Sequence, residues 1–406
     1  YGMKQAAREF YLTMHECLTA AGFDRCPVDP ALYAKVSDGE VVMKVGVHVD
    51  DTLMIYDDDE ALQNLVKHME NFYGTDNVKV DLRPDTFLGI GLIYSDDGAI
   101  GLCQSGYIEK MTNTYTTVLG DREEKYPHDR NGFKVLVDGK KGEVLSDRMI
   151  TKYNELIGSL GYAAVTRFDI QAELSYCRSR LKNPNYGDWC RGLRILRYLR
   201  STKDNVLWYA GPPANESLEE KRMRNILWCT SDASWNGHVD GRGQSGYTIS
   251  FGCFQPPFIT YAGKQSSIAL SSADAEYLVY GELVAELDWF TQVISFLKVS
   301  LTDVHIETDS MSAFKLSNMA FVGKGVRHNN PKCHRFRDAV LSGRVKMFYR
   351  ETFNLWADIL TKPVMGDQFV KLREWIRCGI LPGLRPLLPE QPLDLEKVQN
   401  LVDEDE

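Results

Sequence analysis

The sequence of 406 residues lacks a paired-cysteine motif, a long apolar run and an overall excess of basic charge. Its nine cysteines are odd in number and scattered without a CxxC pair. This distribution argues against a disulfide framework or a zinc site and favours a reducing compartment. No apolar run approaches the roughly 18 residues that span a bilayer, and no secretory signal is visible. We therefore expect no membrane partner and a location in the cytoplasm or the nucleus.

Length and composition favour several globular domains. A chain of 406 residues is too long for one hydrophobic core, so two or three domains are expected. Apolar residues make up 44% and charged residues 25%, which is ordinary for globular protein. We find no internal repeat.

The net charge of −9 counts against a nucleic-acid partner, but the charge is unevenly distributed. Residues 151–209 hold ten Lys/Arg against five Asp/Glu, and residues 314–350 hold nine against one. Residues 390–406 instead hold seven acids and one Lys. The two basic blocks suit a surface that follows phosphates, although solvated helix faces would give the same pattern.

The order of apolar patterns and breaks predicts three structured parts. Residues 59–73 and three segments within 150–201 have helical spacing, and residues 87–104 read as a hairpin that turns at Asp96-Asp97-Gly98. The last part is expected to run strand, strand, strand, long helix, strand, helix, helix, strand, helix, helix. The predicted boundaries are an α/β part (1–118), a linker (119–149), a helical part (150–209), a second linker (210–225), an α/β part (226–378) and an acidic tail (379–406).

Two adjacent acids mark the first part. Asp50 and Asp51 separate the apolar runs 41–49 and 52–56, so both carboxylates are expected at a hairpin tip. Such a pair can hold the metal ions that activate a primer hydroxyl in polymerases. A solvated turn explains the dipeptide equally well.

Four acids are the most informative residues of the last part. Asp232 follows a strand-like run, Glu276 lies in the first turns of a capped helix, Asp309 ends a strand and Asp358 begins a short helix. Each alone would be read as a turn or cap residue. Acids that converge from four elements repel one another unless cations lie between them. Two divalent ions about 3.5–4 Å apart, held by such a cluster, promote hydrolysis of phosphodiesters.

Basic residues provide candidate nucleic-acid contacts. Arg191, Arg194 and Arg197 recur at i, i+3 and i+6, a stripe that could follow a phosphate backbone or face solvent. His328 and His334 lie in a basic segment, where phosphate contact or packing is favoured over zinc binding because no second ligand pair exists.

Residues 1–6 (YGMKQA), 48–51 (HVDD) and 87–90 (FLGI) together resemble motifs of the reverse transcriptase of copia-type retrotransposon Pol polyproteins. Residues 1–6 (YGMKQA) resemble the family's YGLKQAP segment, which packs beside the nucleotide pocket. Residues 48–51 (HVDD) resemble its aromatic-V-D-D motif, and residues 87–90 (FLGI) resemble the hairpin that follows. The resemblance makes Lys4, Gln5, Arg8 and Arg327 further candidate nucleic-acid contacts.

The resemblance continues to about residue 378. Residues 156–162 (LIGSLGY), 166–170 (TRFDI) and 196–199 (LRYL) are similar to the family's LVGSLLY, TRPDI and LRYL segments. Residues 270–277 (LSSADAEY) resemble LSSTEAEY, and residues 357–363 (ADILTKP) are the family's ADILTKP. These motifs are long, and they occur in the family's order.

Several positions depart from the family pattern. Ala7 and Phe168 replace prolines, Phe10 replaces the usual Trp and His48 replaces an aromatic residue. The acid that the family places between the two histidines of residues 326–334 is also missing.

The resemblance implies an α/β (α+β) protein with a partial polymerase palm, a helical thumb or connection, and a ribonuclease H-like domain with a mixed five-stranded sheet. It implies Mg²⁺-dependent hydrolysis of RNA in RNA/DNA hybrids, with two ions per active site. Asp232 and Asp309 would bridge or hold the ions, Glu276 would hold one and orient the attacking water, and Asp358 would complete the second site.

The same resemblance leaves other readings open. In the family the first palm Asp precedes YGLKQAP, so we expect little polymerase activity from this chain, with Asp50 and Asp51 an incomplete site. The expected partners are an RNA/DNA hybrid or primer-template, in a virus-like particle of the cytoplasm or in the nucleus. A second copy of the chain or a host complex is a further expected partner. The alternative function is that of a non-catalytic retrotransposon-derived remnant that serves as a structural subunit of a larger complex.

Overall fold

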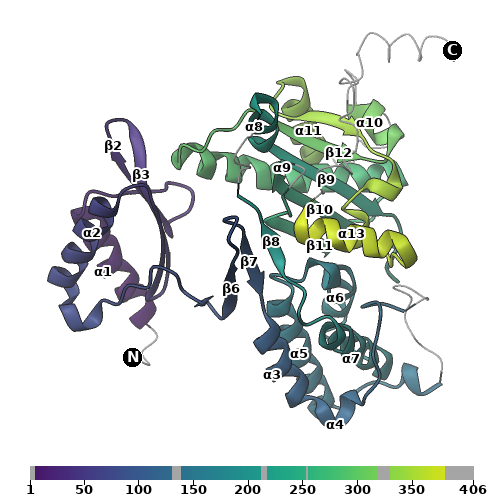
Figure 1. The fold of residues 1–406 in the computed structure, drawn as a ribbon. Helices are drawn as coiled ribbons and strands as arrows, with labels where there is room; N and C mark the ends of the chain where they lie inside the picture. Colours follow the sequence, from purple (N-terminus) through teal and green to yellow (C-terminus); the bar gives the residue numbers. More distant parts are fainter. Residues whose placement is uncertain (1–4, 130–138, 212–216, 253–254, 318–329, 380–406) are drawn as a thin grey trace. The chain divides into compact units, whose positions relative to one another are not determined.

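The computed structural model describes residues 5–129, 139–211, 217–252, 255–317 and 330–379. The chain divides into two compact units. The first comprises Tyr1–Leu88 and Ala285–Leu301, and the second comprises Gly89–Val284 and Thr302–Glu406. Helices and strands occur in both units, as the sequence predicts (Figure 1). Among the described residues, no helix combines the length and apolar character needed to cross a bilayer.

The first unit packs two helices on one face of an antiparallel sheet of four strands in the order β1-β2-β3-β4 (Figure 1). Buried side chains alternate along β3, with Met43 and Val45 facing the helices, because successive residues of a strand point to opposite faces. The elements are α1 (Ala6–Ala20), β1 (Asp24–Arg25), β2 (Leu32–Ser37), β3 (Glu40–His48), β4 (Asp51–Tyr56), α2 (Asp59–Tyr73), η1 (Thr75–Asn77) and β5 (Thr86–Phe87).

The hairpin predicted around the paired acids is present. β3 and β4 pair from Met43 opposite Tyr56 to His48 opposite Asp51, which leaves Val49 and Asp50 as the two-residue loop. Val49 takes a φ of 54°, the positive value that such tight hairpin loops require. Asp50 and Asp51 are both exposed, as predicted for acids at a hairpin tip.

The second unit begins with a hairpin and a group of helices. β8 pairs with β7 and extends the β6–β7 hairpin. Residues 89–119 therefore belong to the same compact unit as the helices. The predicted boundaries instead placed residues up to 118 in the first part. These elements are β6 (Ile90–Tyr94), β7 (Ile100–Cys103), α3 (Ser105–Thr114), α4 (Thr116–Leu119), η2 (Gly139–Gly142), α5 (Asp147–Ala163), η3 (Phe168–Ile170), α6 (Gln171–Ser179), α7 (Tyr186–Ser201) and β8 (Leu207–Tyr209).

The rest of the second unit is built on a five-stranded mixed sheet in the order β11-β10-β9-β12-β13. β9, β10 and β11 are antiparallel neighbours, whereas β12 runs parallel to both β9 and β13. From β9 onward the order of strands and α-helices is the predicted one, whereas α8 lies in the predicted linker and the short η5 was not predicted. Residues of α9 from Ala285 onward belong to the first unit. The elements are α8 (Leu218–Arg224), β9 (Ile226–Ser234), β10 (Gln244–Phe251), β11 (Ile259–Lys264), α9 (Ser272–Phe296), β12 (Asp303–Thr308), α10 (Met311–Ser317), α11 (Asn330–Leu341), β13 (Lys346–Tyr349), η5 (Thr352–Asn354), α12 (Asp358–Thr361) and α13 (Gly366–Cys378).

One hydrophobic core joins the helical part to this sheet. Leu160 of α5 and Leu196 of α7 belong to the same cluster of buried side chains as Trp228 of β9, Leu360 of α12 and Trp375 of α13. α6 also packs on the edge strand β11, where Gln171 donates a hydrogen bond of 2.8 Å to Thr260. The helices therefore support the sheet that carries the four acids.

A buried histidine connects the two parts of this core. His128 is 3% exposed, and its Nε2 donates a hydrogen bond of 2.7 Å to the carbonyl of Val364. Burial lowers the pKa of His128 from 6.5 to about 4. The imidazole of His128 is therefore protonated at a higher pH in the unfolded chain than in the folded chain. Neutral His128 stabilises the folded state fully above pH 6.5, and this stabilisation is lost as the pH falls toward 4.

We expect His128→Gln to be less stable than the parent chain at pH 8, with a difference that shrinks as the pH is lowered to 4. Urea unfolding of both proteins at pH 8, 6 and 4 measures this difference, and the exposed His334→Gln is the control. The same difference at all three pH values would contradict a neutral, buried His128.

Candidate active site

Asp232 lies on the central strand of the sheet. β9 is buried along nearly its whole length because β10 and β12 flank it and helices cover it. Side chains alternate along a strand, so Asp232 shares a face with Trp228 and Thr230. Trp228 packs in the core with α12 and α13, and Asp232 therefore faces the same helices. Its carboxylate is 1% exposed.

Strand register brings Asp309 beside Asp232. In the parallel pair of β12 and β9, Glu307 lies opposite Thr230. Two residues further along each strand, Asp309 is level with Asp232. Asp309 is partly exposed, and the hydroxyl of Thr352 donates a hydrogen bond of 2.7 Å to its Oδ2.

Asp358 reaches the same place from the first turn of α12. This short helix packs directly on β9 and β10, because Gly246 stands opposite Asp232 on β10 and has no side chain to keep it away. A Cβ at Gly246 would lie 2.6 Å from Cγ2 of Thr361 and 2.8 Å from Cβ of Leu360.

Gly246→Ala is therefore expected to push α12 off the sheet and to lower the free energy of unfolding by about 1–3 kcal/mol. Gly158→Ala is the matched control, because Gly158 lies within α5 and a Cβ there would meet nothing within 4 Å. Urea denaturation compares the two variants. Equal stability would show that α12 does not depend on the close approach at Gly246.

Glu276 is held by a capped helix. The hydroxyl of Ser271 accepts a hydrogen bond of 3.1 Å from the amide of Asp274, whose carboxylate accepts one of 2.8 Å from the amide of Leu270. This is the predicted capping arrangement, and it fixes the start of α9. Oε1 of Glu276 accepts a hydrogen bond of 3.0 Å from the amide of Ala233, next to Asp232, whereas Oε2 is buried without a hydrogen-bond partner among the described residues.

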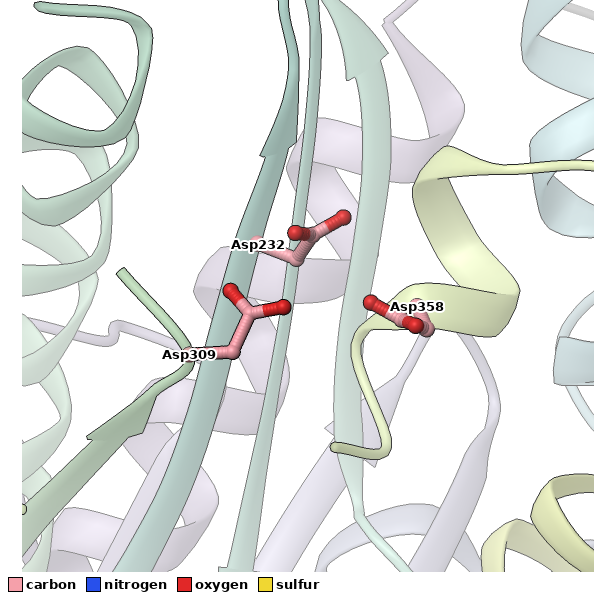
Figure 2. A group of neighbouring side chains, drawn as sticks. All are labelled: Asp232, Asp309 and Asp358. Carbon is pink, nitrogen blue, oxygen red and sulfur yellow. The ribbon is translucent and has the colours of Figure 1, made fainter. Parts of the chain in front are cut away.

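Three of the four predicted acids converge closely. One carboxylate oxygen from each of Asp232, Asp309 and Asp358 lies within 4.8 Å of the others (Figure 2). Glu276 borders this group, since its Oε1 accepts from the residue next to Asp232 and the charges of Asp232 and Asp309 act on it. The structure thus brings three of the four predicted acids together and places Glu276 beside them.

Burial and crowding disfavour negative charge in this cluster. Burial, followed by the neighbouring carboxylates, raises the pKa of Glu276 well above its ordinary value. Burial and the charge of Asp232 raise the pKa of Asp358 to about 7, and burial also raises the pKa of Asp232. Acids in this state are stabilised by a cation that shares them.

Lys362 is a cation of this site that sequence reasoning did not single out. Its Nζ lies 3.1 Å from Oδ1 of Asp232 and 2.9 Å from Oδ1 of Asp358. Burial alone would lower the pKa of Lys362, but the carboxylates of Asp232 and Asp358 raise it. The spacing of Asp358 and Lys362 at i and i+4 was the available signal, because it places two side chains on one helix face.

Neutral donors hold the remaining oxygens of the acids. Thr361 donates a hydrogen bond to Oδ2 of Asp232, and Gln368 donates one of 3.3 Å to Oδ2 of Asp358. With Thr352 on Asp309, each of the three aspartates has one oxygen fixed by an uncharged side chain. Such contacts orient the ligands of metal sites. Thr361 lies within the ADILTKP motif, but no pattern in the sequence indicated a contact with the acids for Thr361, Gln368 or Thr352.

The residues present suit a hard divalent cation. Carboxylate oxygens are the ligands that Mg²⁺ prefers, and the cluster offers several of them within a short distance. The buried Oε2 of Glu276, which lacks a hydrogen-bond partner among the described residues, would gain one in a bound cation or its water. The donor set therefore fits the metal that the resemblance implies.

The predicted arginine stripe is corrected by the structure. Arg191 is 3% exposed, and its Nη1 lies 2.7 Å from Oε1 of the buried Glu173. Arg194 forms an ion pair of 2.7 Å with Glu124, and Arg197 donates a hydrogen bond of 2.6 Å to the carbonyl of Leu119. α7 is a core helix, so these guanidinium groups bind other parts of the protein, and Arg191 cannot follow a nucleic-acid backbone.

The second basic block is also partly neutralised. Arg344 pairs with Asp338, Lys346 with Asp303 and Arg350 with the buried Glu307. Of the other predicted nucleic-acid contacts, Gln5, Arg8 and His334 are exposed and remain predictions, whereas Lys4, Arg327 and His328 lie outside the described residues.

The paired acids of the first unit adjoin a cleft. Asp50 and Val49 at the hairpin tip line a cavity of about 600 Å³ together with Phe10 and Met14 of α1 and Tyr73 of α2. The segment that resembles YGLKQAP contributes Ala6 and Ala7 to the same cleft.

Comparisons with known proteins agree with the motifs. The model of the family described as Reverse transcriptase (RNA-dependent DNA polymerase) matches residues 1–122. The chain is 28% identical over 371 residues to the retrovirus-related Pol polyprotein from transposon RE1 of Arabidopsis thaliana, a match that covers 91% of this chain and 24% of the relative. It is 26% identical over 386 residues to the corresponding polyprotein from transposon TNT 1-94 of Nicotiana tabacum, covering 93% and 27%.

Among solved structures, the foamy viral protease-reverse transcriptase in complex with RNA/DNA hybrid matches with a TM-score of 0.43 at 11% identity, covering 76% of this chain and 36% of that one. The chain spans about a quarter of the length of the curated relatives it matches. The motifs, their order and these matches show that the chain is similar to copia-type retrotransposon Pol polyproteins over at least 91% of its length, and that its residues 1–122 match the reverse transcriptase family.

Proposed function

We propose that the second unit hydrolyses the RNA strand of RNA/DNA hybrids in a reaction that requires Mg²⁺. The observation that carries this proposal is the convergence of Asp232, Asp309 and Asp358 from three separate elements, with the buried Glu276 beside them. The acids also occur in the order of elements in which the resemblance places the acids of the family's ribonuclease H region.

The four acids have distinct roles in this proposal. Asp232 and Asp309 would hold or bridge the metal ions, and Asp358 would complete the second metal site. Bound divalent ions supply Lewis-acid stabilisation of the phosphoryl oxygens and lower the pKa of a coordinated water. Glu276 would hold one ion, and its Oε2, which has no hydrogen-bond partner among the described residues, would accept a hydrogen bond from the attacking water.

Similarity to the Pol polyproteins supports the hybrid as the substrate. A hybrid duplex presents a wide, shallow minor groove with 2′-hydroxyl groups on one strand only, so it is recognised by shape and by these hydroxyls rather than by sequence. The partly exposed Asp309 marks the side from which a phosphodiester can reach the cluster.

The test is cleavage of a labelled RNA/DNA hybrid by the purified chain in Mg²⁺, with single-stranded RNA and double-stranded DNA of the same sequence alongside. We expect cleavage of the RNA strand of the hybrid only, and none after chelation of the metal. No hybrid cleavage at any Mg²⁺ or Mn²⁺ concentration would overturn the proposal and favour the structural-subunit alternative.

A second candidate function, binding of a nucleotide or primer-template by the first unit, is favoured by the cleft beside Asp50. The cleft is lined by apolar and aromatic side chains, with Asp50 and Lys79 as its charged groups. Fluorescence anisotropy with a labelled primer-template would test it, with Phe10→Ala as the variant that enlarges the cleft. Unchanged affinity in this variant would argue against a role for the cleft.

A further inference from the structure

The lysine that bridges two of the acids suggests how the site behaves without metal. Lys362 is the residue directly after α12. Its side chain is 36% exposed, so it lies on the solvent-facing side of the cluster. Its ammonium group contacts Oδ1 of Asp232 and Oδ1 of Asp358, whose other oxygens are held by Thr361 and Gln368. The ammonium thus binds the oxygens that neutral donors leave free.

A divalent cation would need the same oxygens. The carboxylate oxygens of Asp232, Asp309 and Asp358 lie within 4.8 Å of one another, so cations that bind them must occupy the same space. An ammonium group and a metal ion cannot bind the same pair of oxygens without strong repulsion. Oxygens already fixed by Thr361 and Gln368 are less available, because moving them would break buried hydrogen bonds.

On the basis of the proposed function, we propose that the ammonium group of Lys362 substitutes for a metal ion. In the metal-free protein this ammonium occupies the cation position between Asp232 and Asp358. It moves into solvent when a divalent ion binds. The lysine is a positioning residue that holds the carboxylates of Asp232 and Asp358 in place. It also competes with the metal and thereby sets the metal affinity.

This competition makes a distinctive prediction for Lys362→Met. Removal of the ammonium leaves buried acids without a counter-charge, so the metal-free variant is expected to melt several degrees below the parent chain. The variant no longer has to displace a lysine, so it is expected to bind Mn²⁺ about tenfold more tightly, within the usual range for coupled sites. Lys362→Arg retains the charge and is expected to stay close to the parent chain in both properties.

Calorimetric titration with Mn²⁺ and thermal melts with and without Mn²⁺ measure these effects in the full chain. Amine acylation followed by mass spectrometry provides a third readout, because expulsion of Lys362 should increase its labelling when Mn²⁺ is added to the parent chain. Lys346, whose partner Asp303 lies at the far end of β12, is the internal control.

Unchanged or weaker Mn²⁺ binding by Lys362→Met, or labelling of Lys362 that does not respond to Mn²⁺, would overturn the inference. If the parent chain nevertheless cleaves hybrids, the proposed function stands without it. Absence of both Mn²⁺ binding and hybrid cleavage would remove the proposed function as well. If Lys362→Met does not fold, labelling of the parent chain still decides the question.

Discussion

Asp232→Asn is expected to reduce Mg²⁺-dependent cleavage of the hybrid by about a thousandfold. Asp232 lies at the centre of the cluster, with Asp309 level with it on the next strand and Asp358 facing it from α12. Under the proposed function Asp232 would serve both metal positions, so its loss would weaken both. Metal ions contribute several kcal/mol to such reactions, where about 1.4 kcal/mol is a factor of ten. Initial rates of RNA-strand cleavage at saturating Mg²⁺ measure the effect.

Two controls separate this loss from damage to the fold. Asp338→Asn makes the same chemical change on the exposed face of α11 and is expected to leave cleavage unchanged. Asp232→Asn should not unfold more readily, because it replaces a buried acid whose pKa is raised by burial with a neutral group of the same shape. Undiminished cleavage in this variant, or in Glu276→Gln, would refute the assignment of the acids.

Arg191→Met is expected to lower the free energy of unfolding by about 3–5 kcal/mol, because removal of one partner from a buried ion pair leaves the other charge unpaired. The remaining carboxylate belongs to Glu173, which burial already gives a pKa of about 7 even beside Arg191. A raised pKa means that the folded chain binds the proton more tightly than the unfolded chain, so stability decreases as the pH rises toward that value. The loss should therefore be larger at pH 8 than at pH 5.

Urea unfolding at these two pH values measures the effect. Arg344→Met is the matched control, since it breaks an exposed ion pair with Asp338 that is worth less than about 1 kcal/mol. If Arg191→Met folded as stably as Arg344→Met but bound nucleic acid with a smaller salt dependence, the guanidinium would be a phosphate contact after all.

The arginines of α7 show what helical spacing alone cannot reveal. Spacing correctly predicts a helix here and an apolar face with Trp189 and Leu193. It cannot predict that the second face is also covered, because the acids that pair with Arg191 and Arg194 lie in segments 18 and 70 residues away. Only the packing of α6 and the 120–128 segment against α7 makes a basic stripe into a set of internal contacts.

The acids were predictable for a different reason. Each lies at a strand end or helix start that local sequence patterns identify, and the order of elements then fixes the sheet into which they fold. The register of the sheet then sets the spacing of the acids, because β12 runs parallel to β9 and brings Asp309 level with Asp232. The bridging position of Lys362 depends on how α12 lies on Gly246, a tertiary detail that no local pattern contains.

The single core that runs from α5 and α7 through Trp228 to Trp375 has a consequence for how the second unit can be divided. A fragment that starts at Ile226 would carry every acid of the cluster, yet it would expose the apolar surface that the helices now cover. Excision within residues 210–225, between β8 and β9, should thus yield an insoluble or molten product rather than a stable separate domain. Conversely, cleavage of one peptide bond within residues 210–225 should leave the two pieces associated. The cleaved chain should then behave as a single species until denaturant separates the pieces.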